Sequence, residues 1–129
     1  MASLAQDLLA LVKSTSHWLV MIATPPYTHG LDSDPAIDLI LAAGAFGQTA
    51  TVVFVGNGLN YLSADVTVPE GHSDTRKLLK TLPLFDIDYI YALTDLDDSR
   101  LDEIDVAITA IDPQHAGHLV SLADSVVTF

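Results

Sequence analysis

The chain has 129 residues, of which half are hydrophobic, 17 are acidic, five are basic and none is cysteine. This length suits a single domain, and a net charge of −12 disfavours direct binding to nucleic acid or to an anionic membrane, because both are held by Lys and Arg. The lack of thiols excludes disulfides, thiolate metal sites and cysteine nucleophiles from this chain.

We predict that residues 1–16 form an extension that is helical in part, and that residues 17–129 form a single domain. Apolar side chains recur in it at helical spacing, at Leu4, Leu8, Leu11 and Val12. This pattern predicts an amphipathic helix over residues 3–13. The first basic residue, Lys13, follows the apolar stretch, whereas a secretory signal carries its basic residues before it. Since no stretch approaches the roughly 18 apolar residues of a membrane span, we expect a cytoplasmic protein.

Apolar runs then alternate with helical patterns. Residues 17–24 form an apolar run without alternation, which fits a strand buried on both faces of a sheet. After a loop, residues 35–46 predict a helix with Asp34 as its cap and Pro35 in its first turn. Residues 49–58 predict a second buried strand that closes in a Gly-Asn-Gly turn, and the next four residues predict a brief helical turn.

A loop and a third helix follow in the middle of the chain. Residues 63–74 show no periodicity and predict an exposed loop. Residues 75–85 predict a helix that begins after a cap at Ser73 or Asp74 and is disrupted near its end by Pro83.

The last third of the chain predicts a strand, a short helix or turn, a strand, a helix and a final strand. Their expected ranges are 88–93, 96–104, 105–111, 112–123 and 124–129. The later helix has Asp112 as its cap and Pro113 at its first position. Strands that alternate with helices and lack period-two patterning predict an α/β fold, in three layers, with a mostly parallel five-stranded sheet and helices on both faces.

The acidic residues in the segment 95–106 suggest a calcium-binding loop, but only by their composition. An EF-hand loop needs Gly at its sixth position and Glu at its twelfth, and here those positions hold Arg100 and Val106. We therefore expect Asp97 or Asp98 to cap a short helix instead.

The histidines predict no metal centre. His115 and His118 share a helical spacing, which can bind a metal only if other ligands converge, and more often faces solvent. His29, in the loop after the first strand, is a candidate general base, but no nucleophile with a supporting motif is identifiable near it. We predict no catalytic residue, metal or cofactor for this chain.

Polar residues in the loops after the first two strands are candidate contacts for a small ligand or an interface, because α/β sheets bind ligands at the carboxyl ends of their strands. These residues are Thr24, Tyr27, His29, Asn57, Asn60 and Tyr61. The Gly-Asn-Gly turn matches neither the dinucleotide fingerprint nor the P-loop, so a tight strand-to-helix turn is the simpler interpretation.

Three stretches occur in a distinctive order: "TVVFVGNGLNYL" at 51–62, "LLKTLPLFDIDYIYAL" at 78–93 and "ADSVVTF" at 123–129. Together they resemble the TusC/DsrF branch of the DsrE/DsrF/DsrH (TusBCD) sulfur-relay family, over roughly residues 17–129. The matching residues are Lys80, Leu82, Leu84, Phe85, Asp86 and Ile87, then Ala123, Asp124, Val126 and Phe129. Asn57 departs from the pattern, since the family has an acid in that turn.

The resemblance implies a DsrEFH-like domain and an assembly of three related chains as a dimer of heterotrimers. Such complexes relay sulfur as persulfide, to the 2-thiouridine of tRNA in the Tus branch or in sulfur oxidation in the Dsr branch. The family's acceptor cysteine belongs to the TusD/DsrE-type chain, at a position where this chain has Tyr91 or Ala92.

A persulfide requires a thiolate, so we expect a non-catalytic subunit of a sulfurtransferase complex. We expect TusB/DsrH-like and TusD/DsrE-like partners, at least one of which supplies the cysteine, and we expect no direct contact of this chain with nucleic acid or membrane. The low share of charged residues, 17%, favours apolar surface that a partner covers. The alternative is a stand-alone homo-oligomer that binds a small ligand at the carboxyl edge of the sheet.

Overall fold

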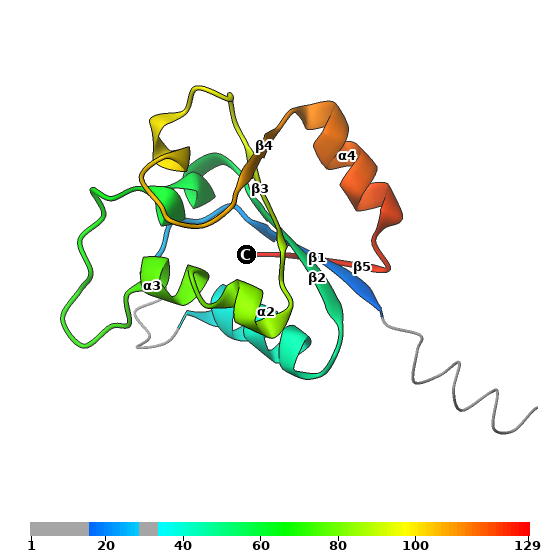
Figure 1. Cartoon of the computed structure of the whole chain (residues 1–129), viewed down its shortest axis with the longest axis horizontal. Coiled ribbons are helices and arrows are strands. Elements are labelled where there is room, and N and C mark those ends of the chain that lie inside the picture. The colour runs from blue at the N-terminus through cyan, green and yellow to red at the C-terminus, as the bar shows by residue number, and fades with distance from the viewer. Residues whose placement is uncertain (1–15, 29–33) are drawn as a thin grey trace, which may run out of the picture.

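Five parallel strands form one sheet at the centre of the molecule (Figure 1). The computed structural model describes residues 16–28 and 34–129, so the predicted helix at residues 3–13 lies outside the described residues. The strands are β1 (His17–Ile22), β2 (Thr49–Phe54), β3 (Tyr89–Leu93), β4 (Thr109–Ile111) and β5 (Ser125–Thr128). Their order is β4-β3-β2-β1-β5, and every neighbouring pair is parallel. The predicted α/β class is confirmed, with a sheet that is parallel throughout.

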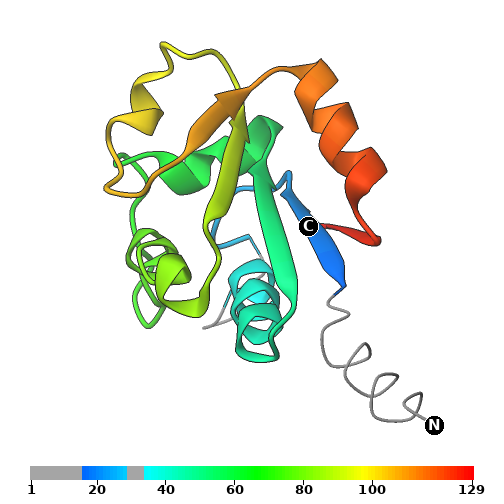
Figure 2. The same cartoon turned by 45° about the vertical axis from the view of Figure 1, so that its right-hand side comes forward.

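Helices cover both faces of this sheet, as predicted. The α-helices are α2 (Pro35–Ala45), α3 (Thr75–Leu79) and α4 (Pro113–Leu122), and the 3₁₀ helices are η1 (Gly56–Leu62), η2 (Leu82–Phe85) and η3 (Ser99–Leu101). Figures 1 and 2 show α2 and α3 on one face and α4 alone on the other. Among the described residues, no helix is both long enough and apolar enough to cross a bilayer.

Two apolar clusters sandwich the central strands. Val20 and Val52 belong to the larger cluster, under α2 and α3, whereas their neighbours Leu19 and Val53 belong to the smaller one, under α4. Successive side chains of a strand point to opposite faces, so β1 and β2 are buried on both sides. This burial explains why their sequences are apolar throughout rather than alternating.

The predicted helix caps are confirmed. The Asp34 carboxylate accepts from the amide of Ile37 at 3.0 Å, and Asp74 accepts from that of Arg76 at 3.0 Å. Asp112 accepts from the amide of His115 at 2.8 Å. Asp98 does the same for η3, where its carboxylate accepts from the amide of Arg100 at 3.0 Å. Each cap satisfies an amide that the first turn of a helix leaves unpaired.

Three predicted elements have different limits. The second strand ends at Phe54 because the chain turns at Gly56, which has φ of 53°. The third helix is divided into α3 and η2, since Pro83 has no amide hydrogen to donate. The fourth strand begins at Thr109 rather than at 105. The residues before it pack Val106 and Ile108 against the larger cluster instead of pairing with β3.

The turn after β2 depends on Gly58. A Cβ atom at this position would overlap the carbonyl oxygen of Ile22 at the end of β1. The same carbonyl accepts the amide of Val55 at 2.9 Å. Gly58 therefore lets η1 close directly over the carboxyl end of β1, which confirms the tight strand-to-helix turn predicted for the Gly-Asn-Gly sequence.

Candidate functional site

The carboxyl ends of β3 and β4 lie next to each other, but the chain leaves them toward opposite faces of the sheet. After β3 it enters the connection that holds η3, whose Leu101 and Ile104 pack on the larger cluster. After β4 it enters α4, whose Ala116 packs in the smaller cluster. Where adjacent connections diverge in this way, a crevice opens beyond the strand ends, and α/β proteins bind ligands in such crevices.

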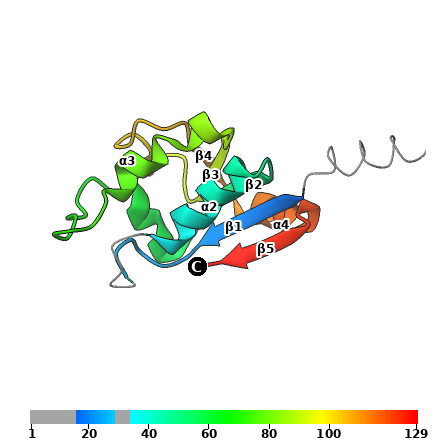
Figure 3. The same cartoon turned by 90° about the horizontal axis from the view of Figure 1, so that it is seen from below.

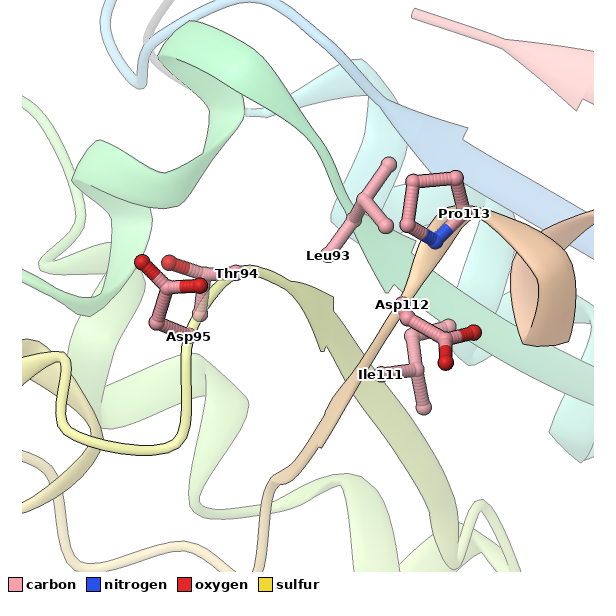
Figure 4. Close-up of a pocket in the computed structure, with 6 residues that line it drawn as sticks. All are labelled: Leu93, Thr94, Asp95, Ile111, Asp112 and Pro113. Carbon is pink, nitrogen blue, oxygen red and sulfur yellow. The ribbon is translucent and has the colours of Figure 1, made fainter.

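A hollow of about 260 Å³ occupies this crevice. Its lining comes from the three residues at the end of each strand: Leu93, Thr94 and Asp95, then Ile111, Asp112 and Pro113 (Figure 4). Leu93 and Ile111 are partners in the β3–β4 register. The crevice thus has an apolar floor formed by the sheet itself and polar groups around its mouth.

Most polar groups at the mouth of the crevice already form hydrogen bonds within the protein. The Thr94 hydroxyl donates to the Asp98 carboxylate at 2.7 Å, and one Asp112 oxygen caps α4. Figure 4 shows the carboxylates of Asp95 and Asp112 on opposite sides of the crevice. The arrangement can enclose a small, partly apolar group, but no activated nucleophile lines it.

A second, wider hollow of about 540 Å³ adjoins the crevice along the first turns of α4. Asp112 lines both hollows, and Gln114, His115 and His118 complete the second. The His115 ring packs against the ring of Tyr91, with centroids 5.7 Å apart. Across residues 16–28 and 34–129, no three His, Asp or Glu side chains gather closely enough to hold a metal ion.

Tyr91 and Ala92, the predicted equivalents of a partner's cysteine position, lie immediately before the crevice on β3. Ala92 is fully buried in the larger cluster. Tyr91 points to the other face and is half-buried against the smaller cluster. Neither side chain presents a group that can accept or donate sulfur.

Two of the predicted ligand contacts anchor helices. The Tyr61 hydroxyl donates to the Asp34 carboxylate at 2.5 Å, beneath the start of α2. Burial, together with this carboxylate, raises the pKa of Tyr61 well above its ordinary value. The Tyr27 oxygen accepts the amide of Thr75 at 3.1 Å, at the start of α3. A ligand role for either tyrosine stays a prediction.

The other predicted contacts are scattered. Thr24 is half-buried just beyond β1, while Asn57 is exposed and Asn60 half-buried on η1. His29 lies outside the described residues. Within residues 16–28 and 34–129, a hollow at the carboxyl edge follows β3 and β4. Its sequence signal is the pair of strand ends "LTD" at 93–95 and "IDP" at 111–113, where an apolar run stops at a polar residue.

The acidic segment after β3 is ordered by one ion pair. The Arg100 guanidinium lies 2.7 Å from the Asp98 carboxylate, and this hydrogen-bonded contact lowers the pKa of Asp98 well below its ordinary value. The Arg76 guanidinium donates to the carbonyl of Glu103, which ties the segment to α3. Leu96 stands out of the segment with 87% of its surface exposed.

Comparison with known proteins identifies the fold. No protein-family model matches the sequence, and no curated protein matches it either. Among solved structures, the crystal structure of the ychN protein from E. coli matches with a TM-score of 0.65 and 13% identity, over 90% of this chain and 100% of that chain. At this identity the match shows the fold alone, which is an α/β fold with a parallel five-stranded sheet.

Proposed function

We propose that this chain is a non-catalytic subunit of a sulfur-relay complex of the TusBCD/DsrEFH kind, in the position of the TusC/DsrF subunit. Its partners would be related small α/β chains of the TusB/DsrH and TusD/DsrE types, assembled in the cytoplasm as a dimer of heterotrimers. One observation carries the proposal: in a DsrE-like fold, the third strand ends without a thiol, in a chain of 129 residues with no cysteine.

The chemistry of the relay supports this assignment. Sulfane sulfur moves when a thiolate attacks it and takes it up as a persulfide. At the carboxyl end of β3, this chain offers the fully buried methyl group of Ala92 and the phenol of Tyr91 against His115. Because none of these groups forms a sulfur–sulfur bond, the transferring cysteine has to come from a partner chain.

Exposed apolar side chains support an association with partners. Among the residues that the structure describes, three large ones are more than four-fifths exposed: Phe46 at 81%, Leu84 at 82% and Leu96 at 87%. Phe46 follows α2, while Leu84 in η2 and Leu96 after β3 are the two that a partner chain would cover. Isolated exposed apolar residues are common on monomers, but several on a small domain with few charges favour a covered surface.

Co-expression tests the proposed assembly. The chain is produced with the small α/β chains encoded beside it and purified through an affinity tag on one of them. We expect the chains to elute together in a fixed ratio, with a cysteine in at least one partner. A chain that elutes as a free monomer beside those partners would contradict the proposal.

The crevice favours a second candidate function, in which the chain binds a small ligand as a homo-oligomer. A thermal-shift screen with nucleotides, flavins and low-molecular-mass thiols tests it. If a ligand binds there, its stabilising effect should weaken in Asp95→Asn, because Asp95 lines the crevice, and persist in Asp97→Asn, an exposed acid outside the lining. No stabilisation by any of these compounds would remove this candidate.

A further inference from the structure

An apolar groove lies between the start of β1 and the last turns of α2, at the amino ends of the strands and thus away from the crevice. It has a volume of about 180 Å³ and is lined by Trp18, Leu39, Ala42, Ala43, Phe46 and Gln48. Figure 3 shows β1 and α2 side by side, with β5 on the other side of β1. Phe46 stands at its rim with 81% of its surface exposed, which is unfavourable for a side chain of this size unless something covers it.

The described chain begins at the rim of this groove. The amide of Ser16 donates to the side-chain oxygen of Gln48 at 2.9 Å, and the amide of Thr49 donates to the carbonyl of Ser16 at 3.2 Å. Trp18, two residues further on, forms part of the groove wall. The fifteen residues before Ser16 are therefore tethered beside the groove.

The sequence of those residues, which lie outside the described part of the chain, supplies a suitable occupant. Its apolar positions at helical spacing are Leu4, Leu8, Leu11 and Val12, and the three residue steps from Lys13, where the predicted helix ends, to Ser16 span up to about 10 Å when extended. The stripe carries no charge, which matches a groove whose only polar lining residue is Gln48.

We propose that the apolar stripe of residues 3–13 docks in this groove of its own chain, with Leu8 and Leu11 beside Trp18 and Phe46. Tethering favours this occupant over a partner chain or a second copy, because a linked segment acts at a high effective concentration. Docking covers Phe46 and shields Trp18 from water.

Trp18 is the only tryptophan of the chain, so its fluorescence reports on the groove. We expect Leu8→Asp together with Leu11→Asp to shift its emission to longer wavelength and to raise the acrylamide quenching constant about twofold, because the groove then opens to water. The matched control, Gln6→Asp with Ala10→Asp, adds the same charge on the opposite side of the predicted helix and should change neither quantity. Unchanged quenching in the leucine variant, or equal changes in both variants, overturns the proposal.

A cross-link gives an independent test, since the natural chain has no cysteine to interfere. Two thiols form a disulfide only when their Cα atoms approach within about 7 Å. Mild oxidation should close an intramolecular disulfide between Leu8→Cys and Ala42→Cys, but not between Gln6→Cys and Ala42→Cys. Failure of the first pair to close, equal yields for both pairs, or disulfide-linked dimers as the main product would each overturn docking on the same chain.

Discussion

The carboxyl edge of the sheet is built in two different ways. Over β1 and β2 it is covered by the described residues, because Gly58 lets η1 sit on the end of β1 and the Tyr61 hydroxyl binds Asp34 at the start of α2. Over β3 and β4 it is open, because the two connections leave toward opposite faces and a hollow remains between them. The comparison teaches that polar residues after a strand can serve the scaffold, and that the direction of the connections decides where a crevice forms.

The strongest test of the closed half is Gly58→Ala. The added methyl group would overlap the Ile22 carbonyl, so η1 has to move away from β1. We expect the free energy of unfolding to fall by about 3 kcal/mol or more, as for other overpacked sites, measured by urea denaturation.

Gly117→Ala is the matched control, because a Cβ atom there meets nothing within 4 Å. It lies within α4, where the change from Gly to Ala should stabilise the protein by roughly 0.5–1 kcal/mol. Similar effects of the two substitutions would show that closure over β1 does not depend on Gly58.

The tyrosine anchors of the closed half should differ in strength. Tyr61→Phe removes a buried hydrogen bond to a carboxylate and should lower the free energy of unfolding by about 1–3 kcal/mol. Tyr27→Phe removes the acceptor for the amide of Thr75 in a partly exposed setting and should cost about 1 kcal/mol or less. Denaturation of both variants checks this order, and a larger loss for Tyr27→Phe would contradict it.

In the open half, the Asp98–Arg100 pair should contribute a small, pH-dependent stability. Folding lowers the pKa of Asp98. The ion pair therefore stabilises the fold fully at pH values above about 4, the pKa of an aspartate in the unfolded chain. This stabilisation is lost as the pH falls through the lower pKa that Asp98 has in the folded chain. The pair lies near the surface, with its carboxylate 11% and its guanidinium 30% exposed, so we expect about 1 kcal/mol at most. Asp98→Asn should remove this part of the acid dependence, and an unchanged pH profile would contradict it.

The smallest effect on stability is expected for Leu96→Ser, also in the open half. Leu96 is 87% exposed, so the substitution should change the free energy of unfolding by less than about 0.5 kcal/mol. If Leu96 meets a partner chain, the same variant should recover less partner in co-purification. Asp97→Ser, its exposed neighbour, is the control for a general effect of altering this segment.

Features set by local chemistry could be predicted from the sequence. Asp34, Asp74 and Asp112 were expected as caps because each stands directly before a helical pattern, and the structure has the corresponding hydrogen bonds. The α/β class and the parallel five-stranded sheet follow from alternating buried runs and helices, whereas the strand order comes from the structure alone. The match to the ychN fold agrees with this class.

Features set by distant contacts could not be predicted. The use of Tyr61 as an anchor depends on Asp34, 27 residues earlier in the chain. The crevice depends on the faces chosen by the connections after β3 and β4, and no local pattern encodes that choice. The late start of β4 likewise reflects the packing of Val106 and Ile108 on the larger cluster, which competes with strand pairing.

The central claim is that this chain supports sulfur transfer without carrying sulfur. The most direct measurement is intact-mass spectrometry of the co-purified complex after incubation with a sulfane-sulfur donor, with this chain alone treated in parallel. We predict that the cysteine-bearing partner gains the mass of one sulfur atom while this chain gains none in either sample. Sulfur bound to this chain and passed on to an acceptor would contradict the account.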